Sequence, residues 1–303
     1  MNTNILPNKI SETIDRKLNS DRLYEIRLRA NKALTVNYGG NFYYLGQDGL
    51  CDLPSKAFNI SAQMLHDVVV KAADYSLYTV NRNICDGFIT IEGGIRVGIA
   101  GEYVWENDKI KTIKNFSGLT VRFPHEIKGC ANALIKPFIS GELRNCLIVS
   151  PPACGKTTML RDLCRSISEM SPASNVLLVD ERSEMAACQN GIPQLDIGNN
   201  VDVISNCDKA TAIMRGIRSM NPQVIITDEL SRSADVEAVY TAASSGVKII
   251  ASVHAADQYD LMNKTTFDNL IKHRMFARYA VLSDKPTIGT VSGIYDENFG
   301  RIY

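Results

Sequence analysis

The chain has 303 residues, and its hydrophobic fraction of 45% and charged fraction of 22% are ordinary for a soluble globular protein. Its length is enough for more than one domain, and its zero net charge gives no global basic field that would indicate nucleic-acid binding. The N-terminus is charged throughout, and no apolar run approaches the roughly 20 residues that cross a bilayer. We therefore expect a cytoplasmic protein, peripheral to a membrane at most, with no transmembrane segment of its own.

Residues 1–128 show the mixed pattern of a small α+β domain that is rich in hairpins. Apolar residues at helical spacing predict a helix over 7–19, and Ser61 is placed to cap a second helix. A hairpin and a β-meander are predicted, with tight turns at Gly39–Gly40, Gly93–Gly94 and Glu106–Asp108. A separate strand is predicted in GLTVRFP, which begins at Gly118.

Two of these predicted strands carry arginines opposite their apolar residues. The stretch LYEIRLR alternates, so Tyr24, Ile26 and Leu28 are expected together on one face. The arginines expected on outward faces are Arg27, Arg29 and Arg122. An arginine on a rigid element can reach the phosphate of a neighbouring molecule, although a solvated strand face explains the same pattern.

From residue 129 to 303 the pattern changes to apolar strands without polar alternation, separated by helices. This pattern predicts a parallel sheet that helices cover on both faces. The predicted elements are strand CLIVS, helix GKTTMLRDLCRSISEM, strand NVLLVD, helix CDKATAIMRGIRSM, strand QVIITDE, helix SADVEAVYTAASS and strand VKIIASV. A return to β-structure is predicted in RYAVLS, TIGTVSGIYD and RIY.

The segment LIVSPPACGKTT places a strand, a turn and a helix in the order that a phosphate-binding P-loop requires. Backbone N–H groups would cradle the phosphates of ATP, Lys156 would reach the β- and γ-phosphates, and Thr157 would hold Mg²⁺. Ser150 replaces the usual first glycine, but it leaves a strand and does not need a positive φ. The predicted nucleotide contacts are Ser150, Pro151, Pro152, Ala153, Cys154, Gly155, Lys156, Thr157 and Thr158.

Three further strands end in residues that can do chemistry. QVIITDE ends in Asp228 and Glu229, LLVDE ends in Asp180 and Glu181, and IIASVH ends in His254. Because the carboxyl ends of parallel strands meet at one crevice, both acidic pairs are expected to face the nucleotide. Asp228 is predicted to hold the Mg²⁺ water shell, and His254 to sense the γ-phosphate. The spacing does not decide which carboxylate activates water.

These segments, in this order, resemble the nucleotide motifs of the stage III sporulation protein AA family: VSPPACGKTTMLRDL, LLVDERSE, RSMNPQVIITDEL and VHA. The stretches YEIRLRANKALTV, IEGGIRVGIAGE and GLTVRFPHEIKGCA resemble the N-terminal half of that family, so the likeness runs through almost the whole chain. The family is similar to the hexameric ATPases of type II and type IV secretion and of pilus machines. The resemblance implies an α/β RecA-like P-loop ATPase domain with a parallel-rich sheet, preceded by a smaller α+β N-terminal domain.

The resemblance also implies roles for individual residues. Lys156 and Thr157 match the Walker A motif, Asp228 and Glu229 match Walker B, and His254 matches the "His box". The acidic "Asp box" is matched by Asp180, Glu181 and Glu184. The three arginines lie in the region from which those machines supply arginines to a neighbour's nucleotide. Three positions depart from common glycines and put the turnover rate in doubt: Ser150, Ala153 and Ser231.

The function implied by the resemblance is that of a homo-hexameric ATPase. It would work at the cytoplasmic face of a membrane channel, on the mother-cell side of an endospore former, with membrane proteins of the same sporulation machinery as partners. Two other functions fit a P-loop. One is a nucleotide-gated scaffold with little turnover. The other is a nucleic-acid-dependent ATPase, which the zero net charge and the lack of a basic, aromatic stripe disfavour.

Overall fold

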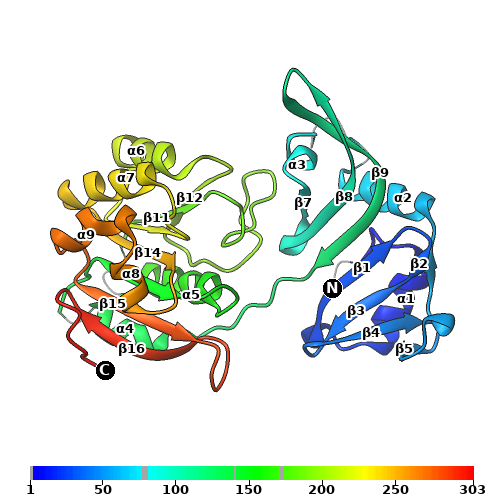
Figure 1. Cartoon of the computed structure of the whole chain (residues 1–303), viewed down its shortest axis with the longest axis horizontal. Coiled ribbons are helices and arrows are strands. Elements are labelled where there is room, and N and C mark those ends of the chain that lie inside the picture. Colours follow the sequence, from blue (N-terminus) through cyan, green and yellow to red (C-terminus); the bar gives the residue numbers. More distant parts are fainter. Residues whose placement is uncertain (1–2, 75, 77–80, 140, 171–173) are drawn as a thin grey trace. The chain divides into compact units, whose positions relative to one another are not determined.

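The computed structural model describes residues 3–74, 76, 81–139, 141–170 and 174–303. Contacts within the chain divide it into two compact units, Met1–His125 and Glu126–Tyr303, which are called the N-unit and the C-unit below (Figure 1). Each unit has its own sheet and its own hydrophobic core. The domain boundary at residues 128 and 129 that the sequence suggests stays a prediction.

The N-unit contains an antiparallel sheet with the strand order β5-β4-β3-β1-β9-β8-β7. Its strands are β1 (Leu23–Arg29), β3 (Thr35–Tyr38), β4 (Asn41–Gly46), β5 (Gly49–Cys51), β7 (Phe88–Ile91), β8 (Ile95–Glu106) and β9 (Lys109–Arg122). A small second sheet pairs β2 (Lys32–Ala33) with β6 (Asn59–Ile60), and the helices are α1 (Asn8–Lys17), α2 (Ala62–Ala72) and α3 (Asn81–Cys85). Apolar residues of α1 and α2 pack against one face of the large sheet.

Local chemistry explains the turns of this unit. Gly39 and Gly40 both have positive φ, as a tight hairpin between β3 and β4 requires. Asn107 and Asp108 adopt the same left-handed conformation between β8 and β9. The Ser61 side chain accepts a hydrogen bond from the Met64 backbone N–H at 3.2 Å, so it caps α2 as predicted.

Two strand predictions for the N-unit were wrong, and β-bulges account for both. Tyr24 is 42% exposed, whereas Leu23 is buried, because a register shift in β1 against β3 places two residues opposite one. GLTVRFP forms a strand with Leu119, Val121 and Phe123 buried as predicted, but it is the second half of β9 and not a separate strand. Residues 115–117 bulge out opposite Gly101 without ending the ladder, and this interrupts the alternation that the sequence shows.

The C-unit contains a sheet with the strand order β12-β11-β13-β14-β10-β15-β16. Its strands are β10 (Cys146–Ser150), β11 (Val176–Asp180), β12 (Val201–Ser205), β13 (Val224–Thr227), β14 (Lys248–His254), β15 (Arg278–Ser283) and β16 (Thr290–Asp296). All neighbours pair in parallel except β15 and β16. The helices are α4 (Asn132–Ile139), α5 (Lys156–Ser168), α6 (Lys209–Met220), α7 (Ser233–Ser244), α8 (Gln258–Met262) and α9 (Asp268–Lys272).

Helices cover both faces of the C-unit sheet. Apolar residues of α4 and α5 pack on one face, and those of α6, α7, α8 and α9 pack on the other (Figure 1). This arrangement confirms the predicted α/β class with a parallel-rich sheet, preceded by an α+β unit. The sequence did not predict the edge strand β12, and RIY is no strand, since only an isolated bridge joins Arg301 to Tyr295. Within the described residues, no helix is long and apolar enough to span a membrane.

Candidate nucleotide site

The predicted site residues of the C-unit gather at one edge of its sheet. Ser150 at the end of β10 pairs with His254 at the end of β14. Thr227 of β13 pairs with Ala251 of β14 and with Val179 of β11, so Asp228 and Asp180 follow at the same edge. The parallel strand order therefore places the P-loop, both acidic pairs and the histidine around the carboxyl ends of neighbouring strands.

The P-loop connects β10 to α5 and keeps the backbone geometry that phosphate binding needs. Ser150 is buried, lies in the strand, and donates a hydrogen bond from Oγ to the carbonyl of Pro151 at 2.8 Å. Gly155 has φ 82° and immediately precedes the first residue of α5, while Ala153 has φ 61°. The serine in place of glycine is thus tolerated without strain, whereas Ala153 holds a conformation that favours glycine.

The Lys156 side chain is buried among acceptors of the loop and of β14. Its Nζ lies 3.0 Å from the Pro151 carbonyl oxygen and 3.4 Å from both oxygens of Ser150. It also lies 2.9 Å from Nδ1 of His254. Because a lysine ammonium can only donate, Nδ1 accepts here and neutral His254 carries its ring proton on Nε2. Burial lowers the pKa of Lys156, and the negative charge of Glu229 opposes that shift.

Glu229 completes a chain of contacts that starts at Lys156. Its Oε1 lies 3.5 Å from Nε2 of His254, on the side of the ring opposite Lys156. The Glu229 backbone has φ 24°, and its N–H donates to Oγ of Ser252 at 2.9 Å. A non-glycine residue in this region is strained, and the neighbouring structure must hold it there. The His254 imidazole thus contacts the P-loop lysine through Nδ1 and the Glu229 carboxylate through Nε2.

The carboxylates of Asp228 and Glu181 contact a buried lysine, Lys209, that sequence reasoning did not single out. Nζ of Lys209 lies 3.0 Å from Oε2 of Glu181 and 3.1 Å from Oδ1 of Asp228. Arg232 donates to both oxygens of Glu181, at 3.0 and 3.2 Å. Burial raises the pKa of Asp228, and Lys209 opposes the shift. Glu181 is therefore held between two cations, whereas Glu229 has only the longer contacts to His254 and Arg182.

Asp180 organises the loop that follows β11. Its carboxylate accepts backbone hydrogen bonds from Glu184, Met185 and Ala186 at 2.9, 3.0 and 2.8 Å. The side chain is fully buried, and burial raises its pKa against the effect of these donors. Arg161 of α5 donates to the carbonyls of Glu184 and Met185, which ties the same loop to the P-loop helix. With its oxygens engaged in this way, Asp180 leaves Glu181 and Glu229 as the carboxylates that could act on water.

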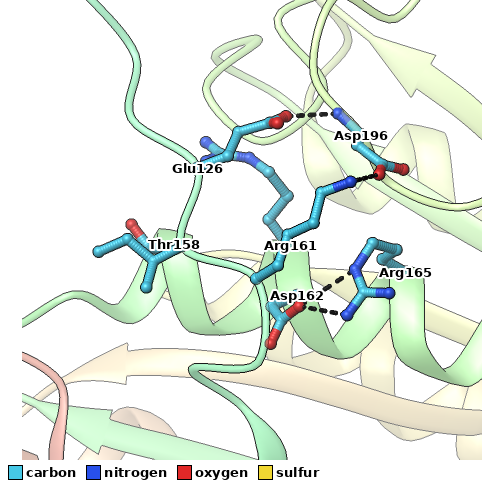
Figure 2. A pocket seen from close by; sticks show the side chains of 8 residues that line it. Glu126, Thr158, Arg161, Asp162, Arg165 and Asp196 are labelled. Carbon is cyan, nitrogen blue, oxygen red and sulfur yellow. Dashed lines mark hydrogen bonds and ion pairs between the residues drawn. The ribbon is translucent and has the colours of Figure 1, made fainter. Parts of the chain in front are cut away.

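The two threonines after Lys156 are both half-buried at the start of α5. Figure 2 shows Thr158 on the wall of a small pocket with Arg161, Asp162 and Arg165 of α5. The opposite wall of this pocket is formed by residues 126–128 and Asp196. Ion pairs and hydrogen bonds within the pocket join Lys128 to Asp196, Glu126 to the Asp196 backbone and Asp162 to Arg165. Thr158 thus lies where α5 meets the first residues of the C-unit.

The donors present fit a Mg²⁺ ion. The Thr157 hydroxyl and the Asp228 carboxylate offer hard oxygen ligands, which Mg²⁺ prefers. Oδ1 of Asp228 is buried and forms an ion pair with Nζ of Lys209 at 3.1 Å, so this oxygen already faces a cation. Among the described residues there is no group of three or more His, Cys, Asp or Glu that could hold an ion.

The three predicted arginines belong to the N-unit and share the outward face of its sheet. Arg122 lies opposite Glu25 of β1 and contacts it at 3.4 Å, and Arg27 makes a closer ion pair with the same carboxylate. Arg29 donates to Oγ1 of Thr35 at 3.1 Å. The sequence analysis missed Arg96, which lies opposite Arg122 and stacks on the Phe88 ring. Arg96 alternates with buried Ile95 and Val97, and this alternation in the sequence could have identified it as an outward-facing arginine.

Comparison with known proteins identifies the family. The family described as "Sporulation stage III, protein AA" matches residues 2–302. Stage III sporulation protein AA of Bacillus subtilis (strain 168) is 37% identical over 278 residues, which cover 90% of this chain and 87% of the relative.

Solved structures show the fold. The pilus retraction motor PilT with bound ADP aligns with a TM-score of 0.59 at 14% identity, over 90% of this chain and 76% of that one. The Legionella pneumophila ATPase DotB aligns with a TM-score of 0.55 at 14% identity, over 86% and 72%. These likenesses confirm the RecA-like P-loop fold of secretion ATPases. The family match and the relative together show that the chain belongs to the sporulation stage III protein AA family.

Proposed function

We propose that the chain is an ATP-hydrolysing motor that acts as a homo-hexamer and energises a membrane-associated, secretion-like channel during endospore formation. The observation that carries the proposal is the line of contacts from Lys156 through His254 to Glu229 beside an intact P-loop. The membership of a sporulation family and the fold of secretion ATPases support it. We place the motor at the cytoplasmic, mother-cell face of the membrane, where a membrane protein of the same machinery would hold it.

Binding of ATP would use the loop backbone and Lys156. The N–H groups around Gly155 and the start of α5 present positive partial charge to the phosphates. Lys156 would exchange its contacts with the Pro151 carbonyl and His254 for phosphate oxygens. Mg²⁺, held by Thr157 and Asp228, would neutralise the charge that develops on the phosphates.

Hydrolysis needs a carboxylate that can accept a proton from water. Glu229 fits this role better than Glu181, because Lys209 and Arg232 already hold the Glu181 carboxylate. Glu229 keeps an oxygen 3.5 Å from Nε2 of His254. His254 would position Glu229 through Nε2 and meet the γ-phosphate side of the site once Lys156 has moved.

The test compares two isosteric substitutions in single-turnover hydrolysis. We expect Glu229→Gln to bind a fluorescent ATP analogue normally and to slow hydrolysis by at least about 100-fold, because the proton acceptor is lost. We expect Glu181→Gln to slow it by less than about tenfold. Glu169→Gln, at an exposed carboxylate after the end of α5, serves as the control. Wild-type turnover in Glu229→Gln would remove this carboxylate from the mechanism.

The same measurements separate the two other functions. A wild-type protein that binds ATP but does not hydrolyse it in a single turnover would be a nucleotide-gated scaffold. An ATPase that single-stranded DNA stimulates, with a steep dependence on salt, would be a nucleic-acid-dependent enzyme.

A further inference from the structure

Lys209 lies in a place that is unfavourable for a lysine. It is only 3% exposed, and removing an ammonium group from water is costly unless other groups compensate its charge. It is also the first residue of α6, where the partial positive charge of the helix end repels a cation. Both costs must be offset by the two carboxylates that its Nζ contacts, Glu181 at 3.0 Å and Asp228 at 3.1 Å.

The start of α6 does not need this lysine. Asp208 already caps the helix by accepting a hydrogen bond from the Thr211 N–H at 3.0 Å, and Ala212 and Ile213 anchor it in the core. Glu181 does not depend on it either, since Arg232 donates to both of its oxygens. The partner that depends on Lys209 is Asp228, because among the described residues Lys209 is the cation that contacts its buried Oδ1, at 3.1 Å. Lys209 is thus the cation that compensates the buried Asp228 carboxylate.

We infer that Lys209 is a positioning residue that shares Asp228 with the metal ion and so makes the site select metal–nucleotide complexes over free divalent cations. This inference rests on the proposed nucleotide site. A unit positive charge about 3 Å from Oδ1 opposes the approach of a free Mg²⁺ ion. The phosphates of ATP bring negative charge that offsets this repulsion, so Mg²⁺ binds at Asp228 together with the nucleotide. Lys209 also keeps the Asp228 side chain aimed into the site when no metal is bound.

The test measures binding of Mn²⁺, as a probe for Mg²⁺, to the full-length chain without nucleotide. The free ion is followed by electron paramagnetic resonance. We expect the wild type to bind Mn²⁺ weakly, and Lys209→Met to bind it at least about tenfold more tightly, because the competing charge is gone. Lys209→Met/Asp228→Asn should lose that gain, which assigns the added affinity to Asp228. Lys264→Met, which removes an exposed lysine paired with Asp260, should match the wild type.

Three results would overturn the inference. One is a folded Lys209→Met protein with wild-type Mn²⁺ affinity, and another is a gain that persists after Asp228→Asn. The third is tight Mn²⁺ binding by the wild type without nucleotide. This measurement can overturn the inference even if no variant folds. The double variant removes both partners of a buried pair, which disturbs folding less than removing one.

The proposed function has a separate readout. If the wild type fails to bind ATP, the proposed function fails. The Mn²⁺ comparison is made without nucleotide and still decides whether Lys209 competes for Asp228.

Discussion

Gly155 holds a backbone conformation that a side chain would strain, at the point where the loop must approach phosphate. Its φ is 82°, and an added Cβ would lie 3.3 Å from Cγ2 of Ile288 and 3.5 Å from Cα of Gly289. We expect Gly155→Ala to lower the free energy of unfolding by about 1–2 kcal/mol. We also expect it to weaken ATP binding by about tenfold or more, because the loop amides move from their phosphate positions.

Gly191→Ala is the matched control for this substitution. Gly191 has φ 80° and open space around its Cα, so the same backbone strain arises outside the P-loop. Denaturant unfolding should show a similar loss of stability, while titration with a fluorescent ATP analogue should show wild-type affinity. Equal loss of ATP affinity in both variants would mean that global stability, and not loop geometry, sets the binding.

Sequence reasoning identified individual residues where a motif determines which strand or helix they follow. Lys156, Glu229 and His254 follow predicted strands, and the structure brings their side chains into contact. It could not find Lys209, because a lysine that follows a helix cap normally extends into solvent. Only the packing of α6 against β11 turns the side chain inward to Glu181 and Asp228, and that packing leaves no local signal.

The helix α5 is fastened to the first residues of the C-unit by Asp162. Its Oδ2 accepts the Ala131 N–H at 2.9 Å, and its Oδ1 accepts Arg165 at 2.7 Å (Figure 2). Asp162→Ala should lower the free energy of unfolding by about 2–3 kcal/mol, because a buried N–H and a guanidinium lose their acceptor. Glu169→Ala removes the exposed partner of the same Arg165 and should cost less than about 1 kcal/mol. Urea unfolding at neutral pH measures both, and equal losses would contradict the role of Asp162.

The contribution of Asp162 has a defined pH dependence. Burial would raise its pKa, but the hydrogen bonds from Ala131 and Arg165 outweigh burial and hold the pKa below the usual value. A carboxylate with a lowered folded-state pKa stabilises the fold above the unfolded value of about 3.9. The difference between the wild type and Asp162→Ala should therefore be constant near neutral pH and shrink as the pH falls through the folded-state pKa.

At the level of elements, the strands buried on both faces were predicted correctly from their apolar runs, and the hairpin and meander of the N-unit from their turn residues. Uninterrupted apolar runs such as CLIVS become β10 and its neighbours, because both faces of that sheet are covered. The missed strand β12 lies at the edge of the sheet and is only partly buried, with Asp202 exposed, so its sequence does not stand out. The bulges in β1 and β9 contain residues that have no opposite residue on one neighbouring strand, and a period-two pattern cannot anticipate this.

At the scale of the whole molecule, the chain consists of two units with different fold classes, and the candidate chemistry is divided between them. The C-unit holds the P-loop, the acidic pairs and His254, and the N-unit holds the arginine face of Arg27, Arg29, Arg96 and Arg122. Within the N-unit, the strand pattern predicts that face, and the register of β1, β8 and β9 assembles it. In the proposed hexamer these arginines would act on the nucleotide of a second copy of the chain, and mixed subunits can test this.

Subunit mixing distinguishes an arginine that acts on a neighbour from one that acts within its own chain. We choose Arg122, because its side chain is 64% exposed and its substitution should leave the N-unit folded. Arg122→Ala alone should lower ATPase activity by at least about tenfold, since a cation that stabilises the transition state is lost. Glu229→Gln alone should be nearly inactive.

In a mixture, an Arg122→Ala subunit keeps a complete P-loop and Glu229, and a Glu229→Gln neighbour supplies Arg122. Activity above the sum of the two parents is therefore expected from an arginine that acts in trans. Arg16→Ala, at an exposed arginine of α1, should have wild-type activity. A mixture no more active than its parents, with mixed oligomers confirmed by native mass spectrometry, would place Arg122 outside the neighbour's site.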